Sequence, residues 1–329
     1  MAESMSVWQQ SDYGPATGMR LTRRPIPEPG DGEVLLRLRA AALNAGDVRV
    51  MLGDPLLVRL VFGIRRPRNP VRGMDVAGTV VAVAVGAGVG WVQPGDEIVV
   101  ELPGGGGLAE YAVAPAGRLV HRPDPVPPSH GATLPIAAGT AWQALDAAGV
   151  RDGHRVLILG ASGGVGTFAV QLAKLRGAQV DATCSARNRA AVEALGATSI
   201  DRDTPLAELP AGAYDAVIEI ASGSPLRRLR RLLRDGGTAV LVGGDGGRVL
   251  GPVPRMLGAA VLSIGSGRRI RSLAAKARPE ILAQLLALAA AGRLQPVIER
   301  QYAFADADGA LAHVEAGHTI GKVVVRIGE

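Results

Sequence analysis

The chain has little cysteine and few aromatic residues. Its one cysteine, Cys184, rules out an internal disulfide and is typical of a protein from a reducing compartment. Aromatic residues make up only 3% of the sequence, so we expect cores built mainly from Val, Leu, Ile and Ala. These two shortages exclude a disulfide-stapled secreted scaffold and leave an aliphatic, globular protein.

Long apolar stretches are also missing. The apolar piece from Leu56 to Ile64 contains Arg59 and is too short to span a bilayer. The first residues lack the basic start and apolar stretch of a signal peptide. We therefore expect a cytoplasmic protein with no membrane partner.

What is present points to a two-domain globular protein. The 329 residues are 47% hydrophobic and 20% charged, which is typical of a soluble fold with room for two cores. The net charge of +6 raises the question of a nucleic-acid partner. The densest basic run, from Arg227 to Arg234, alternates with leucines at helical spacing. We interpret it as the solvated face of an amphipathic helix, with a phosphate-binding patch as the alternative, and expect no nucleic-acid partner.

The pattern of the chain changes near a proline-rich joint at residues 123–128. Before it, strands over Glu33–Ala42, Val76–Val85 and Glu97–Glu101 predict a mainly antiparallel β domain. After it, short apolar strands alternate with helices, which predicts a parallel sheet covered on both faces. We predict an α/β fold with a β-rich domain at 1–124, completed by 269–329, and a doubly wound domain at 125–268.

The second domain is predicted element by element. A long helix should follow it at Pro279–Ala291, and a final strand at Lys322–Ile327 should return to the sheet of the first domain. Strands are expected at 155–159, 179–184, 216–220 and 239–242, and helices at 165–176 and 189–195.

A glycine-rich turn between strand 155–159 and the next helix is the strongest local signal. Glycines let the backbone approach a diphosphate closely, and the free N–H groups of the helix N-terminus attract its charge. The strand before and the helix after supply the context that a bare glycine motif lacks. The predicted cofactor contacts in this turn are Gly160, Ser162, Gly163, Gly164, Val165 and Gly166.

The end of the next strand indicates which dinucleotide binds. An NAD site usually has an acidic residue there, to hold the ribose hydroxyls. This strand instead ends in Ser185, followed by Arg187 and Arg189, residue types that suit a 2′-phosphate. Asp181 would favour NAD if it stood at the tip, but it lies inside the apolar run. We therefore predict NADPH and keep NAD as the alternative.

Several motifs together resemble a known family. The segment from Leu134 to Leu145, followed by GASGGVGTFAVQLAK, is similar to the zinc-free quinone oxidoreductase branch of the medium-chain dehydrogenases/reductases. Other matching motifs are Asn44 with Asp47, Gly73–Gly78, Pro94–Glu97, Gly107–Tyr111 and the segment starting at Ile320. The resemblance covers nearly the whole chain.

The resemblance implies a GroES-like catalytic domain and a Rossmann domain. It places Thr140 near the nicotinamide, and Gly243 and Gly244 close to the same end of the cofactor. Arg202 stands where many relatives carry a tyrosine beside the adenine ribose, so it is a third arginine for the 2′-phosphate.

Zinc is not expected. A catalytic zinc needs about three Cys, His or carboxylate ligands. Zinc-dependent relatives carry a histidine near the position of Met74 and a cysteine near Asn44–Asp47, and this chain has neither. The five histidines lie outside these motifs, at His121, His130, His154, His313 and His318.

Without zinc, hydrogen bonds must polarise the acceptor. Asn44 could orient the carbonyl oxygen or the nicotinamide ribose, and Asp47 could organise a water or supply a proton. The alternative is that both residues only shape a local turn, as Asn and Asp readily do. Val48 and Leu108 stand where relatives often have aromatic residues, so we expect a less aromatic substrate pocket, which disfavours a flat quinone.

The expected activity is hydride transfer from NADPH to a small α,β-unsaturated carbonyl or quinone. A zinc-independent alcohol/ketone oxidoreductase, or a biosynthetic tailoring reductase, is the nearest alternative. A non-catalytic NADPH-binding or RNA-binding protein is the alternative from another class, although no RNA-stacking aromatic cluster is present. We also expect a homodimer joined through an edge strand at Ala259–Gly265, with an interior strand as the alternative for this segment.

Overall fold

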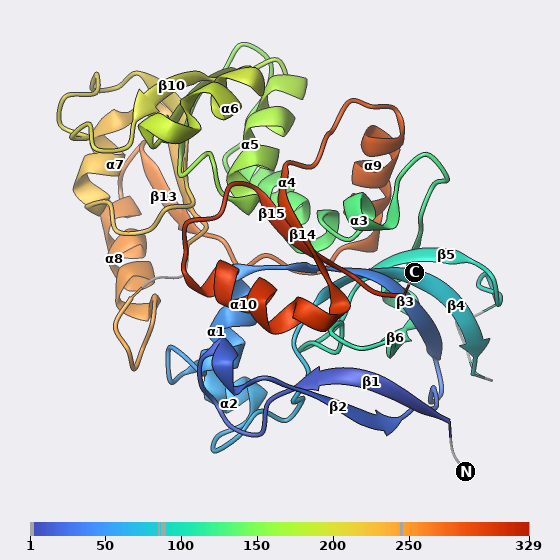
Figure 1. Cartoon of the computed structure of the whole chain (residues 1–329). Coiled ribbons are helices and arrows are strands. Elements are labelled where there is room, and N and C mark those ends of the chain that lie inside the picture. Colours follow the sequence, from blue (N-terminus) through green and yellow to red (C-terminus); the bar gives the residue numbers. More distant parts are fainter. Residues whose placement is uncertain (1–2, 85, 87–89, 244–245, 329) are drawn as a thin grey trace. The chain divides into compact units, whose positions relative to one another are not determined.

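The computed structural model describes residues 3–84, 86, 90–243 and 246–328 (Figure 1). The chain divides into two compact units, one of residues 1–139 and 277–329 and one of residues 140–276. This division differs from the predicted one at two places: residues 269–276 belong to the second unit, and residues 125–139 belong to the first. There the N–H of Ile136 donates a hydrogen bond of 3.2 Å to the carboxylate of Asp75.

The first unit is built on a sheet with the strand order β14-β15-β3-β4-β5-β7, and β6 pairs with β3. All of these pairs are antiparallel except β14 with β15, which confirms the predicted antiparallel domain. The last strand returns to this sheet as predicted, because Val323 pairs with Leu43. The strands of the unit are β1 (Ser4–Gln9), β2 (Arg20–Pro25), β3 (Glu33–Leu43), β4 (Asp75–Val83), β5 (Glu97–Glu101), β6 (Tyr111–Pro115), β7 (Val120–His121), β14 (Ile298–Ala303) and β15 (Lys322–Arg326).

Short helices surround this sheet. They are α1 (Ala45–Leu52), α2 (Val58–Phe62), α3 (Pro128–Gly131), α9 (Pro279–Ala290) and α10 (Ala307–Glu315). The core joins Leu36 and Leu38 of β3 to Val323 and Val325 of β15 and to Leu311 of α10. Among the described residues, no helix is long and apolar enough to cross a membrane.

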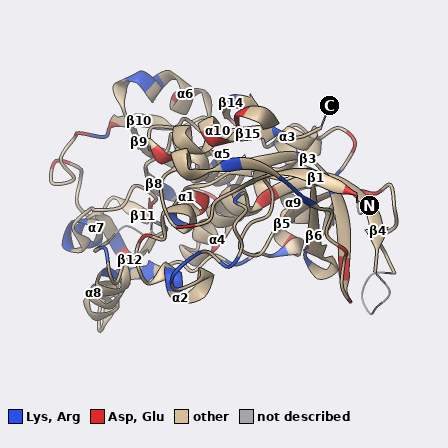
Figure 2. Ribbon diagram, turned by 60° about the horizontal axis from the view of Figure 1, so that its bottom comes forward, with Lys and Arg blue, Asp and Glu red and all other residues tan. Residues whose placement is uncertain are grey.

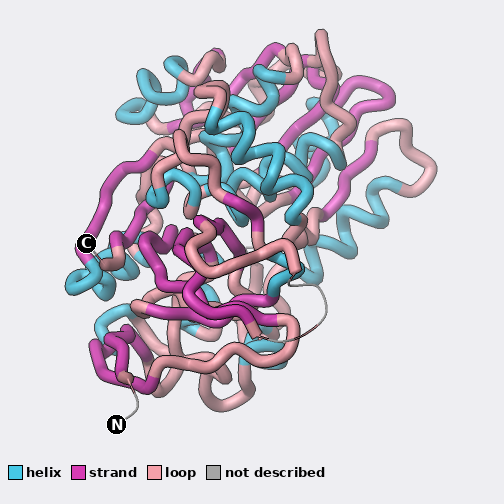
Figure 3. Tube along the Cα trace, turned by 90° about the vertical axis from the view of Figure 1, so that its right-hand side faces the viewer, coloured by secondary structure: helices cyan, strands magenta, loops and turns pink. Residues whose placement is uncertain are grey.

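The second unit is a parallel sheet with the strand order β10-β9-β8-β11-β12-β13. The direction of chain crossover reverses between β8 and β11, so the helices fall on both faces (Figures 1 and 3). The strands are β8 (Arg155–Leu159), β9 (Gln179–Cys184), β10 (Thr198–Asp201), β11 (Tyr214–Glu219), β12 (Leu233–Leu241) and β13 (Arg269–Ser272). The helices are α4 (Gly139–Ala147), α5 (Gly164–Leu175), α6 (Arg189–Ala194), α7 (Leu226–Leu232) and α8 (Val253–Ser263).

The basic run forms the amphipathic helix α7. Leu229 and Leu232 are buried, and Arg227 and Arg228 are exposed. In Figure 2 the ribbon positions of Lys and Arg are coloured blue along α7 and in other elements of both units. The amphipathic helix is therefore confirmed, with Arg227 and Arg228 on a solvated face, whereas Arg230 and Arg231 are half-buried and donate to backbone carbonyl oxygens and Arg234 lies on β12.

The predicted edge strand at Ala259–Gly265 is wrong. Most of this segment belongs to helix α8, and the edge strands of the sheet are β10 and β13. Pro254 at the start of the helix, and apolar residues spaced as Leu257, Val261 and Ile264, fit a helical period, but a short apolar run does not distinguish the two structures. The homodimer remains a prediction, which light scattering can test, without this strand as its basis.

Candidate functional site

The predicted cofactor residues of the second unit lie where successive parallel strands end. The glycine turn follows β8, Ser185 follows β9, Arg202 follows β10 and Gly243 comes soon after β12. Because the carboxyl ends of parallel strands meet at one edge of a sheet, these residues share that edge. Gly244 lies outside the described residues.

The glycines of the turn have different physical roles. Gly160 has a φ of +90°, and a Cβ on it would lie 2.8 Å from Ala221. A Cβ on Gly166 would lie 2.2 Å from the carbonyl oxygen of Gly160, closer than real Cβ atoms approach. A Cβ on Gly163 would instead be 3.8 Å from its nearest neighbour. Gly160 and Gly166 are therefore required by the turn itself, whereas Gly163 leaves open space beside it.

Thr183 of β9 anchors the turn at the start of α5. The N–H of Gly160 donates to Thr183 Oγ1 at 3.1 Å, and the N–H of Ala161 donates to the Thr183 carbonyl oxygen at 3.0 Å. Helix α5 then begins at Gly164, with Gly163 as its N-cap. Ser162, Gly164 and Val165 stay half-buried. The turn therefore presents a helix N-terminus, where anions are stabilised.

The tip of β9 combines an unsatisfied hydroxyl with cationic side chains. Ser185 Oγ is buried and has no hydrogen-bond partner among the described residues. Arg187 and Arg189 follow it and are exposed. The N–H of Arg202 donates to the Cys184 carbonyl oxygen at 2.9 Å, which brings a third arginine to this corner. An anionic group bound here would give Ser185 its missing partner and meet positive charge.

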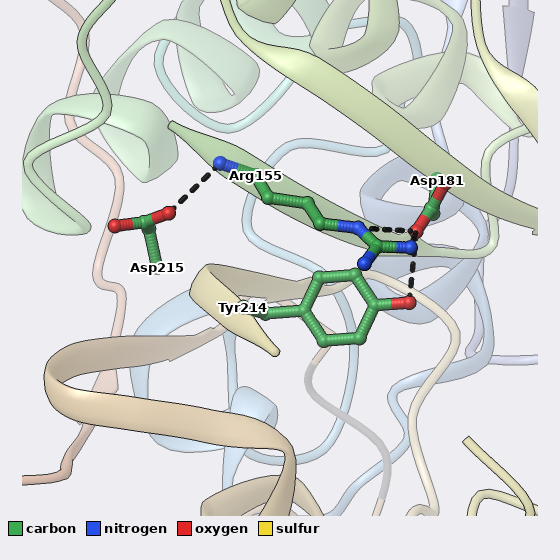
Figure 4. Close-up of polar contacts among 4 residues, drawn as sticks. All are labelled: Arg155, Asp181, Tyr214 and Asp215. Carbon is green, nitrogen blue, oxygen red and sulfur yellow. Dashed lines mark hydrogen bonds and ion pairs between the residues drawn. The ribbon is translucent and has the colours of Figure 1, made fainter. Parts of the chain in front are cut away.

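Asp181 is committed to contacts inside the unit (Figure 4). Its Oδ2 accepts hydrogen bonds from Arg155 Nε at 3.1 Å, Arg155 Nη2 at 2.8 Å and the Tyr214 hydroxyl at 2.9 Å. Burial and the hydrogen bond to Asp181 raise the pKa of Tyr214, so that hydroxyl stays a donor. Asp181 lies three residues before the strand ends, and its donors lie on β8 and β11. The tip of β9 therefore carries no carboxylate of its own, although Asp201 of β10 pairs with Cys184 beside it.

A buried ion pair at the end of β11 was not found from the sequence. Glu219 is 1% exposed, and Arg255 Nη2 of α8 lies 2.8 Å and 2.7 Å from its two carboxylate oxygens. The N–H of Ser224 donates to Glu219 Oε1 at 2.9 Å, and the N–H of Gly243 donates to the Glu219 carbonyl oxygen at 3.3 Å. Glu219 thus ties α8 and two loops to the carboxyl edge. The signal in the sequence was an acid at the end of an apolar strand.

In the first unit, Asn44 and Asp47 form the turn at the start of α1. Asp47 Oδ2 accepts from the N–H of Asn44 at 2.9 Å, and Oδ1 accepts from the N–H of Gly73 at 3.0 Å. Burial raises the pKa of Asp47, while these two N–H groups and the charges of Lys322 and Arg72 oppose that rise. Both oxygens of Asp47 therefore hold backbone in place.

The side chain of Asn44 is held by two charged residues distant in the sequence. Lys322 Nζ donates to Asn44 Oδ1 at 2.5 Å and to the Leu43 carbonyl oxygen at 2.8 Å. Asn44 Nδ2 donates to Asp75 Oδ2 at 2.9 Å. Burial raises the pKa of Asp75 to about 8 and lowers the pKa of Lys322. The only sequence signal for this cluster was a charged residue at the start of each of two apolar strands, β4 and β15.

The remaining predicted residues are placed as follows. Thr140 is half-buried at the start of α4, directly after a π-helical turn over Leu134–Ala138, a backbone form that is frequent at functional sites. Val48 and Leu108 are buried in the core of the first unit. Within the described ranges, no group of three or more His, Cys, Asp or Glu residues is placed to hold a metal ion.

Two family models match the chain. One, described as an alcohol dehydrogenase GroES-like domain, matches residues 30–124. The other, described as a zinc-binding dehydrogenase, matches residues 195–325. The first confirms that the β-rich unit has the GroES-like fold, and the parallel sheet of the second unit is the Rossmann-like partner expected with it.

Relatives match over almost the full length. The chloroplastic quinone-oxidoreductase QR1 of Triphysaria versicolor is 39% identical over 98% of each chain. The mitochondrial NAD(P)H oxidoreductase RTN4IP1 of Bos taurus is 32% identical over 98% of this chain and 89% of its own. The structure of the quinone oxidoreductase from Coxiella burnetii matches with a TM-score of 0.86 and 28% identity, over 99% of this chain and 100% of that one. The chain therefore belongs to the quinone oxidoreductase-like branch of the medium-chain dehydrogenase/reductase superfamily and is an oxidoreductase of that type.

Proposed function

We propose that this protein is an NADPH-dependent oxidoreductase that reduces a small α,β-unsaturated carbonyl or quinone-type molecule without zinc. The observation that carries the proposal is the tip of β9, where Ser185 Oγ has no partner among the described residues, Arg187 and Arg189 follow along the chain, and the acid within β9, Asp181, already accepts hydrogen bonds from Arg155 and Tyr214. Membership of the family supports a nicotinamide cofactor, and this tip favours the one with a 2′-phosphate.

The carboxyl edge of the second unit fits such a cofactor. The space beside Gly163 and the N-terminus of α5 would receive the diphosphate. Ser185, with Arg187, Arg189 and Arg202, would hold the 2′-phosphate. The proposed contacts near the nicotinamide are Thr140, Gly243 and Gly244. When bound, NADPH supplies the hydride.

Asn44 is the proposed donor to the acceptor oxygen. Reduction of an enone adds a hydride to the β-carbon and a proton to the α-carbon, so negative charge develops on the carbonyl oxygen in between. A hydrogen-bond donor that is already oriented stabilises that charge, and such donors are usually the largest catalytic contribution. Asp47 serves this donor by fixing the backbone of Asn44 and Gly73.

Zinc independence rests on the residues that are present. Zinc-dependent relatives have a histidine near the position of Met74 and a cysteine near the segment Asn44–Asp47, and this chain has neither residue type there. Hydrogen-bond donors must then polarise the acceptor in place of a metal ion. The predicted cytoplasmic location stays a proposal, since several relatives carry chloroplastic or mitochondrial names.

The test is a spectrophotometric screen of the purified full chain. NADPH oxidation is followed with a panel of enones and quinones, and NADH and a panel of simple ketones and aldehydes serve as comparisons. We expect NADPH turnover with at least one enone or quinone and less with NADH. Turnover only with simple ketones or aldehydes would support the alternative oxidoreductase, and no turnover with any acceptor would contradict the proposed activity.

A further inference from the structure

The amide of Asn44 has a fixed orientation, because a cation lies at one end of it and a carboxyl group at the other. Lys322 Nζ is 2.5 Å from Oδ1, and Asp75 Oδ2 is 2.9 Å from Nδ2. A flipped amide would point its NH₂ group at the ammonium and its oxygen at the carboxyl group. Nδ2 therefore keeps one hydrogen whose contact is long, at 3.5 Å to the Ala42 carbonyl oxygen.

Exposure singles out Asn44 as the member of this cluster that can meet a ligand. Asn44 keeps 8% of its surface exposed, whereas Asp75 has 0% and Lys322 has 2%. The two charged residues are more deeply buried, so Asn44 is the member of the cluster with the most surface available to a bound molecule.

We propose that Lys322 and Asp75 are positioning residues that orient and polarise the Asn44 amide, so that a buried ammonium strengthens the N–H left for an acceptor oxygen. The role in the reaction rests on the proposed function, but the contacts that carry it lie within the first unit. Hydrogen bonds in a chain polarise one another in a low-dielectric interior, and a charge at Oδ1 draws electrons away from Nδ2.

The buried cation, Lys322, is a lysine in a chain that has few lysines. The sequence holds only Lys174, Lys276 and Lys322, and its other cationic residues are arginines. An ammonium is a compact charge that can donate to two nearby oxygens, here those of Leu43 and Asn44. Its burial is costly, and nearby carboxyl groups favour its charged form.

Several charged groups set the protonation of this cluster. Asp75 and Asp47 favour the ammonium form of Lys322, and burial opposes it. The charge of Glu101 on β5 also acts on Asp75. Burial raises the pKa of Glu101, and the charge of Arg118 opposes that rise. The charge of Arg72 lowers the pKa of Asp47. Removal of the Asp75 charge should therefore leave Lys322 easier to deprotonate.

The first test is NMR of the cofactor-free full chain, labelled with ¹⁵N. The Asn44 side-chain resonances are assigned as those lost in Asn44→Asp. We expect one Nδ2 proton far downfield in the wild type, an upfield move in Lys322→Met and a smaller move in Lys322→Arg. Arg300→Met, which removes an exposed charge from the neighbouring strand β14, should leave the resonances unchanged. Equal Asn44 shifts in wild type and Lys322→Met would overturn the proposal.

Asp75→Asn provides a second variant if Lys322→Met does not fold. Its Asn44 resonances should respond to Lys322 deprotonation at lower pH than in the wild type. An unchanged titration would also overturn the proposal.

If the wild type turns over, Lys322→Met should lower kcat by about tenfold with KM for NADPH unchanged, because the lost interaction acts on the acceptor. Absence of turnover in the wild type contradicts the proposed function but leaves the NMR result to decide the positioning role.

Discussion

The two units present their polar groups in opposite ways. The second unit offers backbone N–H groups, open glycine space and exposed arginines along one sheet edge. The first unit encloses Lys322, Asp75 and Asp47 around a single amide. The exposed edge suits a charged ligand that brings its own phosphates, whereas the buried cluster suits a neutral acceptor on which charge develops only during the reaction. The two sites therefore differ in burial in the same way as their proposed ligands differ in charge.

The largest expected effect separates structural from binding glycines within the second unit. Gly166→Ala should destabilise the turn and weaken NADPH binding by at least about a hundredfold, because its Cβ would lie 2.2 Å from the Gly160 oxygen. Gly163→Ala has room for its methyl group and should lower NADPH affinity without changing Tm. Thermal unfolding and calorimetry of both variants measure this, and equal losses of Tm would refute the distinction.

The next effect compares a buried with an exposed ion pair. Arg255→Met leaves Glu219 buried without its partner and should cost about 3–5 kcal/mol of unfolding free energy. Arg268→Met breaks the exposed pair with Asp235 and should cost less than about 1 kcal/mol. Urea denaturation of the two variants gives both values. Similar costs would mean that the Glu219 pair does not hold α8 and its loops in place.

A charge placed at the tip of β9 should change the preference between cofactors. Ser185→Asp sets a carboxylate where the 2′-phosphate is proposed to bind, so NADPH affinity should fall by about tenfold while NADH affinity is retained. Competitive displacement of each nucleotide measures the ratio. Equal weakening of both nucleotides would show that Ser185 is near the cofactor but not near its 2′-phosphate.

The smallest effect concerns the pH dependence of stability in the first unit. The pKa of Asp75 is raised by burial from 3.8 to about 8, so folding favours its protonated form. That contribution is fully present below about pH 4 and is lost as the pH rises to about 8. Asp75→Asn removes this contribution. The difference in Tm, variant minus wild type, should therefore rise by a few degrees between about pH 4 and about pH 8. A constant difference in Tm would mean that Asp75 is ionised throughout.

The sequence predicted one of these two sites far better than the other. The glycine turn lies within residues 160–166, and its flanking strand and helix were found with nearly the observed bounds. Local spacing was enough there, because one strand, one turn and one helix build most of the site. The role of Asp181 could not be predicted from the sequence. Only the structure shows that its carboxylate already accepts hydrogen bonds from Arg155 and Tyr214.

The cluster in the first unit could not be assembled from spacing. Asn44, Asp75 and Lys322 come from three strand ends that meet only because β3 pairs with both β4 and β15. The return of the last strand was predicted, but the register that brings Lys322 to Asn44 was not. Helix α8 was missed because its short apolar run fits a strand as well as a helix.

The central claim is that the carboxyl edge of the second unit binds NADPH through its 2′-phosphate. Calorimetric titration of NADPH and NADH into wild type and Arg187→Ala tests it most directly, with Arg227→Ala on α7 as the matched control. The account predicts tighter binding of NADPH, a preference that falls by about ten- to a hundredfold in Arg187→Ala, and no change in Arg227→Ala. Equal binding of the two nucleotides by the wild type, or an unchanged preference in Arg187→Ala, would contradict it.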